Sequence, residues 1–157
     1  GATIDAWSAA GRDDPGIQHN VGSDAYSQFG FTWGVNDLGL SSYGFSTPVT
    51  SVVQWTAPSA GTAVLEVTFG ATAATVSEGV NGLVRKSLTR DGSSATTWGD
   101  TFTVSAGDTI AFGAGDVGTI TMCQAAITFT PVPEPTSLVL LGMGITGLTA
   151  YAWRKRK

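Results

Sequence analysis

The sequence predicts an all-β fold, an antiparallel β-sandwich, followed by a single C-terminal transmembrane helix. Short runs of alternating apolar and polar residues recur between turn formers at spacings of about 8–12 residues, which is typical of a sandwich or barrel. The 21 glycines, with many Thr, Ser, Ala and Val residues, favour strands and turns over helices. Residues 136–153 carry no charged side chain, which predicts the membrane helix.

The first strands are expected after a loop-rich lead-in. Residues 1–29 are polar and rich in turn formers, so they predict irregular structure with one early strand at most. Phe29, Phe31 and Trp33 then alternate with small residues, as in a half-buried strand. Residues 30–130 are therefore expected to form the sandwich.

The middle of the chain predicts a series of strands joined by tight turns. Val49–Thr56 is rich in Val and Thr, and Thr62–Gly70 alternates so that Ala63, Leu65, Val67 and Phe69 share one face. Asn81-Gly82 lies between two strand-like runs and predicts a hairpin, because both turn residues need positive φ.

The last strands complete a set of about eight, the spacing expected of a sandwich. Thr101–Ser105 and Thr109–Gly113 flank a turn at Ala106-Gly107-Asp108. The final strand runs from about Thr119 to Thr130, and its length predicts a bulge or a strand shared between two sheets.

The C-terminal residues 136–157 predict a membrane helix with a basic cytoplasmic end, after a linker at residues 131–135. At about 1.5 Å per residue a helix over 136–153 is roughly 27 Å long, close to a hydrocarbon core of about 30 Å. The cations that follow it resist translocation and predict a cytoplasmic C-terminus: Arg154, Lys155, Arg156 and Lys157. The remainder of the chain is then expected outside the membrane.

A family resemblance is carried by three consecutive features of this tail. Pro133-Glu134-Pro135, the Gly-rich apolar run and the terminal Arg154–Lys157 resemble the PEP-CTERM sorting signal of bacterial surface proteins. The resemblance implies export, in organisms that make extracellular polysaccharide. It also implies processing at or near the Pro-Glu-Pro triplet by an exosortase, a membrane transpeptidase-like enzyme.

The strand region is similar to the jelly-roll domains found in PEP-CTERM proteins. Trp55-Thr56-Ala57-Pro58 followed by Ala60-Gly61 resembles the opening of those domains, and Ala106-Gly107-Asp108-Thr109-Ile110 resembles their later part. The resemblance covers about residues 48–130 and implies a jelly-roll-like sandwich. Some such domains bind carbohydrate.

The charge and the cysteine content of the chain exclude some classes of partner and of covalent bond. All twelve Asp and Glu residues lie at or before Glu134, so the part expected outside the membrane is acidic, which argues against nucleic acid as a partner. Cys123 is the single cysteine, so no disulfide forms within the chain, and its apolar strand context predicts a buried, inert thiol. Export also requires a signal peptide, which we expect to precede Gly1.

The sequence predicts that this protein is not an enzyme. Glycoside hydrolysis needs two carboxylates about 5–10 Å apart across one bond, and Glu66 and Glu78 are the glutamates of the sandwich region. Glu66 is expected on a strand face and Glu78 near a hairpin tip. His19 is the single histidine, expected in a solvated loop, and with Cys123 it makes zinc improbable.

Two kinds of binding site have candidate residues. Calcium is the better metal hypothesis, because Asp13, Asp14 and Asp24 lie in loops rich in turn formers, although capping of turns is the simpler role for these residues and no cofactor is expected. Sugar binding uses exposed aromatic faces, and Trp98, Trp33 and Tyr43 are the candidate contacts, with packing in the core or rim as the alternative.

Three functions are compatible with these observations. The first is an exported, noncatalytic cell-surface or extracellular-matrix protein, held transiently at the membrane, processed by an exosortase and associated with exopolysaccharide. The second is a specific carbohydrate-binding module. The third is a self-assembling fibre or coat subunit, since strands rich in Thr, Val and Ala permit edge pairing. The partners expected are an exosortase, membrane lipid through the C-terminal helix, and extracellular polysaccharide.

Overall fold

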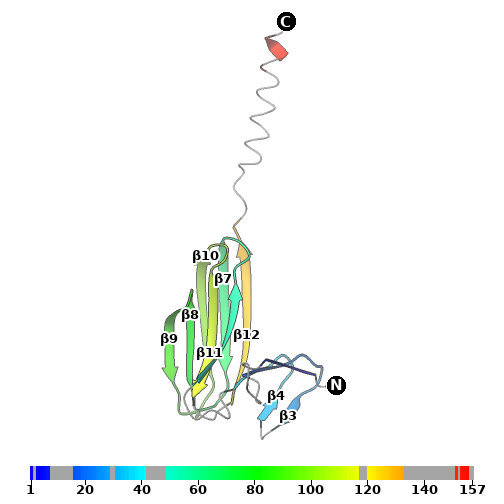
Figure 1. Ribbon diagram of the computed structural model, residues 1–157, viewed down its shortest axis with the longest axis vertical. Helices are drawn as coiled ribbons and strands as arrows, with labels where there is room; N and C mark the ends of the chain where they lie inside the picture. Colours follow the sequence, from blue (N-terminus) through cyan, green and yellow to red (C-terminus); the bar gives the residue numbers. More distant parts are fainter. Residues whose placement is uncertain are drawn as a thin grey trace.

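The described part of the chain is built from β-strands. The computed structural model describes residues 1, 3–7, 16–28, 31–41, 49–116, 120–132, 151 and 153–155. Within these residues it forms twelve strands, in three antiparallel sheets. Figure 1 shows the long strands running side by side, with the small β3–β4 hairpin beside their lower end.

The largest sheet has six strands in the order β1-β2-β5-β12-β7-β10. Every neighbouring pair in it is antiparallel. Its strands are β1 (Ile4–Trp7), β2 (Ile17–Asn20), β5 (Leu38–Ser41), β7 (Gly61–Phe69), β10 (Thr96–Val104) and β12 (Ile120–Pro131).

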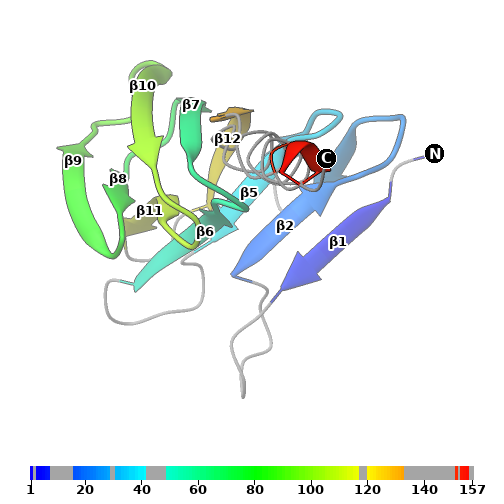
Figure 2. The ribbon, with the colours of Figure 1, turned by 90° about the horizontal axis from the view of Figure 1, so that it is seen from above.

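The second sheet has four strands in the order β6-β11-β8-β9, and a two-stranded sheet joins β3 to β4. The two larger sheets pack face to face, as the end-on view in Figure 2 shows for β10-β7-β12 over β9-β8-β11. The predicted antiparallel β-sandwich is therefore confirmed. These strands are β3 (Tyr26–Gln28), β4 (Phe31–Trp33), β6 (Val49–Thr56), β8 (Thr75–Val80), β9 (Leu83–Thr89) and β11 (Thr109–Asp116).

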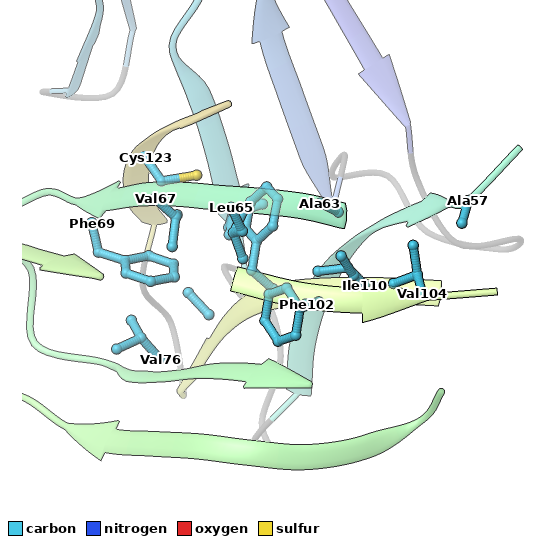
Figure 3. Packing of buried hydrophobic residues seen from close by; sticks show 13 residues of the cluster. Ala57, Ala63, Leu65, Val67, Phe69, Val76, Phe102, Val104, Ile110 and Cys123 are labelled. Atoms are coloured by element: carbon cyan, nitrogen blue, oxygen red, sulfur yellow. The ribbon is translucent and has the colours of Figure 1, made fainter. Parts of the chain in front are cut away.

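Strand β7 provides the centre of the core. Its burial alternates strictly, so that Ala63, Leu65, Val67 and Phe69 are buried on the inner face, as the sequence predicts. Figure 3 shows these side chains meeting others from β8, β10 and β11 between the two sheets. Burial of an aliphatic or aromatic side chain of this size contributes about 1.5–3 kcal/mol. The same alternation turns every second residue of β7 outward, where it is free to form a site.

The Asn81-Gly82 hairpin forms as predicted. Asn81 has φ 51° and Gly82 has φ 76°, the left-handed values that a two-residue hairpin turn needs, and β8 pairs with β9 across it. The Asn81 side chain also accepts a hydrogen bond from the Thr109 amide at 2.8 Å. The turn is thereby joined to the start of β11.

The last strand differs from its predicted form. Its length reflects two successive partners in one sheet, because β12 pairs with β5 over Ile120–Cys123 and with β7 over Cys123–Pro131. It is not shared between the two larger sheets. The two partners follow one another along the strand, which sequence periodicity does not reveal.

The N-terminal region contains more regular structure than a loop-rich lead-in. β1, β2 and β3 all lie before residue 29. Each has only three or four residues. Strands this short give too few alternations to be recognised from sequence.

The predicted C-terminal transmembrane helix is wrong for this structure. The described residues contain no helix with the length and apolar character needed to cross a bilayer. Residues 133–150 of the predicted linker and helix lie outside the described residues. The prediction rested on the length and apolar character of residues 136–153 alone. At Tyr151 a single turn is closed by a hydrogen bond of 3.2 Å from the Lys155 amide.

Candidate functional site

A groove lies on the outer face of the six-stranded sheet, the face turned away from the second sheet. Its volume is about 540 Å³. We call it the sheet groove; it crosses β12, β7 and β10 beside the loop that follows β4. Its lining residues are Val35, Asn36, Glu66, Thr68, Thr97, Trp98, Gly99, Gln124, Ala125 and Ala126.

Strand register places an open carboxylate in the middle of the sheet groove. Glu66, on β7, points outward and lies between Gly99 of β10 and Ala126 of β12. Gly99 has no side chain, and a Cβ built there would meet no atom within 4 Å. Because both cross-strand neighbours are small, the Glu66 carboxylate is exposed and reachable from the groove.

The next outward position adds neutral hydrogen-bonding groups. Thr68 lies between Thr97 and Gln124, and the Thr68 and Thr97 hydroxyls are 2.9 Å apart. Gln124 Nε2 donates to Asp37 Oδ1 at 2.6 Å. A carboxylate only accepts, so this bond fixes the amide with its Nε2 on Asp37 and assigns Oε1 as the acceptor for a ligand. Asp37 is itself held by the Gly34 amide, which donates to Oδ2 at 2.7 Å.

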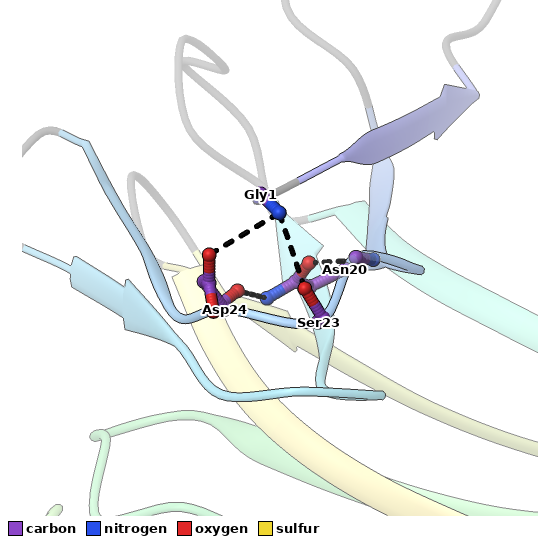
Figure 4. Close-up of polar contacts among 5 residues, drawn as sticks. Gly1, Asn20, Ser23 and Asp24 are labelled. Carbon is purple, nitrogen blue, oxygen red and sulfur yellow. Dashed lines mark hydrogen bonds and ion pairs between the residues drawn. The ribbon is translucent and has the colours of Figure 1, made fainter.

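The loop wall of the sheet groove is held by a buried asparagine. Asn20 is fully buried at the end of β2, and its Nδ2 lies 2.8 Å from the Asp24 carbonyl, 3.1 Å from that of Trp33 and 3.0 Å from that of Gly34. Its own carbonyl accepts a 2.9 Å hydrogen bond from the Asn36 amide, which fixes the groove residue at φ 64°. Figure 4 shows the Asn20 side chain bonded to Asp24, with Gly1 directed at Ser23 and Asp24.

Of the candidate aromatic contacts, half-buried Trp98 lines the sheet groove and Trp33 does not. Trp33 is fully buried, and its ring packs against Tyr26 and Phe31 with centroid distances of 5.7 and 6.4 Å. Trp98 borders the groove, but its ring packs edge-on against buried Phe69 at 5.5 Å, on the inner side of the sheet. Tyr43 lies outside the described residues.

Trp98 is the groove residue that the sequence predicted as a contact; the polar groups Glu66, Gln124 and Asn36 were not predicted as contacts. The signal in the sequence was the outward position of Glu66 on a strongly alternating strand. Its small neighbours, Gly99 and Ala126, come from strands far away in the chain. Only the pairing register shows that these three residues are adjacent.

The two glutamates considered for hydrolysis are not brought together. Glu66 is exposed on the outer face of β7, whereas Glu78 is buried on β8 in the other large sheet. His19 is half-buried within β2 rather than in a loop.

Of the three calcium candidates, the structure describes Asp24. Asp13 and Asp14 lie outside the described residues. Asp24 is exposed, and its Oδ2 lies 3.2 Å from the Gly1 ammonium nitrogen (Figure 4). Among the residues that the structure describes, no group of three or more His, Cys, Asp or Glu side chains could hold a metal ion. Calcium binding stays a prediction.

Cys123 lies under the groove with its thiol turned inward. The side chain is buried and packs in the hydrophobic core. Burial raises the pKa of its thiol to about 12, and the nearby Asp37 carboxylate adds to the rise. The thiolate, which is the reactive form, is therefore disfavoured at neutral pH.

The sandwich leads directly into the tail. β12 ends at Pro131, and the amide of exposed Val132 donates to the Ala60 carbonyl at 3.0 Å. Pro133, Glu134 and Pro135 lie outside the described residues, as do Arg156 and Lys157, while Arg154 and Lys155 are exposed.

Comparison with known families identifies this tail. Residues 131–157 match the family model of the PEP-CTERM protein-sorting motif, which leaves the sandwich outside the match. No curated protein matches the chain. The motif implies export, transient membrane anchoring before processing, and recognition by an exosortase. The chain therefore carries, over residues 131–157, a PEP-CTERM sorting signal of the kind that directs proteins through an exosortase to the cell surface.

Proposed function

We propose that this is a noncatalytic cell-surface or extracellular-matrix protein that associates with exopolysaccharide through the sheet groove. The sorting motif supports delivery to the surface, and the groove is the observation that carries the proposed activity. In this proposal the basic end at Arg154–Lys157 stays on the cytoplasmic side until processing, because terminal cations resist translocation.

The chemistry of the groove suits a hydroxyl-rich chain. The Glu66 carboxylate and Gln124 Oε1 accept hydrogen bonds, and the Thr68–Thr97 pair both donates and accepts. The floor at Gly99 and Ala126 is flat enough for an extended chain to lie across three strands. Adjacent sugar hydroxyls present the matching donors and acceptors.

The charge of the groove selects among polysaccharides. Glu66 is the charged residue among those that line it, and it is negative. The chain as a whole has a net charge of −4, with its cations concentrated at the C-terminal end. Like charges repel, so the groove favours a neutral glycan over a uronate-rich or sulfated one.

The packing of the Trp98 ring bears on the expected affinity for sugar. Stacking of sugar on aromatic rings adds substantial contact area in many sugar sites, and here the Trp98 ring is committed to Phe69. Hydrogen bonds exchanged with water contribute only about 0.5–1.5 kcal/mol each. Each site is therefore expected to bind weakly, and retention in a matrix would depend on many copies along one polymer.

Two substitutions test the groove. Ala126→Trp would place a large ring over the floor beside Glu66 and is expected to abolish co-sedimentation with neutral exopolysaccharide from the producing organism.

Glu66→Gln is expected to weaken binding about tenfold, because bonds to a charged acceptor contribute roughly 1.5–3 kcal/mol and the amide retains part of that. Binding is measured by sedimentation over a range of polysaccharide concentrations.

Thr103→Ala serves as the matched control, since Thr103 is exposed on the same outer face of β10 but does not line the groove. It is expected to leave binding unchanged. Wild-type binding that survives Ala126→Trp, in a variant with native strand content by circular dichroism, would contradict the assignment of the groove.

A further inference from the structure

A charge cluster with a buried glutamate lies where one edge of each large sheet comes together; its Lys86 and Asp100 side chains are 39% and 30% exposed. β9 is an edge strand of the four-stranded sheet and β10 is an edge strand of the six-stranded sheet. Figure 2 shows both at the same side of the molecule. Glu78 of β8, Lys86 of β9 and Asp100 of β10 meet there, and we call them the edge cluster.

Register and alternation direct all three side chains between the sheets. Lys86 is the cross-strand partner of Glu78, beside a bulge that leaves Arg85 as the extra residue of β9. Asp100 is paired with fully buried Leu65, which places it on the inner face of β10. The bulge thus keeps Lys86, rather than Arg85, opposite Glu78.

Within the edge cluster, the Lys86 amine lies in contact with the Asp100 carboxyl group. Lys86 Nζ lies 3.0 Å from Asp100 Oδ2 and 4.0 Å from Glu78 Oε1. Asp100 Oδ1 accepts a hydrogen bond of 3.1 Å from the Thr101 amide. The Asp100 carboxyl group is therefore held with one oxygen on a backbone donor and the other on the amine.

The buried position of Glu78 destabilises the fold if its carboxyl group is ionised and has no role. Its side chain has 0% exposure, and among the described residues neither carboxyl oxygen is within hydrogen-bond geometry of a donor, the nearest cation being Lys86 at 4.0 Å. An ionised carboxylate in this position would lose its hydration without replacement. Burial raises the pKa of Glu78, the Lys86 ammonium lowers it and the Asp100 carboxylate raises it, with burial the largest cause. Glu78 is thus suited to hold a proton next to the Lys86–Asp100 pair.

We propose that Lys86 and Asp100 join in an intramolecular amide bond, with Glu78 as the group that relays protons during its formation. The pair begins as ammonium and carboxylate, since the hydrogen bond from Lys86 lowers the pKa of Asp100. One proton passes from Lys86 Nζ to the Asp100 carboxyl group. The neutral amine then attacks Asp100 Cγ, while the protonated Glu78 stabilises the developing negative charge on oxygen.

The reaction balances without any further reactant. A second proton leaves the nitrogen and reaches the departing Asp100 oxygen through Glu78. The C–O bond breaks, one water molecule is released, and the Glu78 carboxyl group is restored. Ammonium and carboxylate have become a neutral amide and water, with no oxidant, reductant or activated donor consumed.

Such a bond would join the two sheets at their open edge. It connects β9 to β10, which belong to different sheets. Because Cys123 is the single cysteine, the chain cannot form an internal disulfide. A covalent link between sheets restricts the unfolded chain as a disulfide does, and it resists reduction.

Mass spectrometry of the full chain tests the proposal. Wild-type protein is expected to be lighter than its sequence by one water molecule, and its digest to contain a branched peptide that joins Lys86 to Asp100. Lys86→Arg keeps the positive charge but cannot act as the amine, Asp100→Ala removes the carboxyl group, and Glu78→Gln removes the proton relay. Each of these variants is expected to have its full mass.

The controls separate the bond from other causes of the same mass change. Glu66→Gln, a glutamate on the exposed face of β7, is expected to keep the branched peptide. Folding of each variant is checked by circular dichroism, and Lys86→Arg provides a second reading if Glu78→Gln misfolds. Folded wild-type protein at full mass would overturn the proposal. A water loss that persists in Lys86→Arg, for example by cyclisation at Asp91-Gly92, would overturn it equally.

Discussion

Phe69→Ala is expected to lower the free energy of unfolding by about 3–5 kcal/mol, the usual cost of removing a buried aromatic side chain. Phe69 is fully buried at the end of β7 and holds the Trp98 ring edge-on at 5.5 Å. The variant therefore loses apolar burial, leaves a cavity between the sheets and frees Trp98. A loss of this size is a large fraction of the roughly 5–15 kcal/mol that stabilises a typical domain.

Urea unfolding followed by tryptophan fluorescence measures this effect. Leu83→Ala is the matched control, because Leu83 is apolar but 73% exposed, and it is expected to change stability by less than about 0.5 kcal/mol. Equal losses in the two variants would show that the core does not lie between these sheets.

Asn20→Ala is expected to lower the free energy of unfolding by about 3 kcal/mol. The two N–H groups of Nδ2 are shared among three carbonyl oxygens, Oδ1 is an acceptor, and each of these three groups contributes roughly 1 kcal/mol net when it is hydrogen-bonded. The Asn20 carbonyl oxygen Oδ1 also accepts from the Gly22 amide at 3.0 Å. Buried groups left without partners cost more than the bonds are worth, so the loss exceeds that of a surface asparagine. The groove wall at Asn36 is expected to loosen as well, with faster exchange of its amide hydrogen.

Gln28→Ala provides the comparison for Asn20. It removes an amide side chain whose hydrogen bond, from the Tyr26 hydroxyl, is exposed. Chemical denaturation of both variants should show little change for Gln28→Ala. An Asn20→Ala variant as stable as wild type would mean that the loops after β2 and β4 find other partners.

The sandwich could be predicted because its central strands carry their pattern locally. The alternation of β7 and the Asn81-Gly82 turn each depend on a few consecutive residues, and both formed as expected. The short strands before residue 29 and the change of partner along β12 depend on contacts between distant segments. No local period encodes those contacts.

The functional groups were harder to predict for the same reason. Trp33 is an aromatic residue of the kind that contacts sugars, but the structure buries it, and its ring nitrogen fills the space in which Gly39 would carry a side chain. Glu66 becomes accessible only because Gly99 and Ala126 lie beside it. From the sequence, Glu78 is predicted near a hairpin tip. Only the folded structure shows that Lys86, its cross-strand partner, contacts Asp100 of β10.

The tail shows the opposite relation between sequence and structure. Its sorting motif is recognisable from residue order alone, and residues 131–157 match the family model. Its apolar run led to a helix prediction that the structure contradicts. A sorting motif is recognised from consecutive residues, whereas the conformation of a segment cannot be read from its apolar character alone.

The most direct test of the account is the mass of the C-terminal peptide of the mature protein, isolated from the surface or matrix of the producing cells. Processing through the sorting motif predicts a new C-terminus between Pro133 and Thr136, with Leu138–Lys157 absent. Mature exported protein that still ends in Arg156-Lys157 would contradict the account, because the tail would then be kept rather than used for sorting and removed.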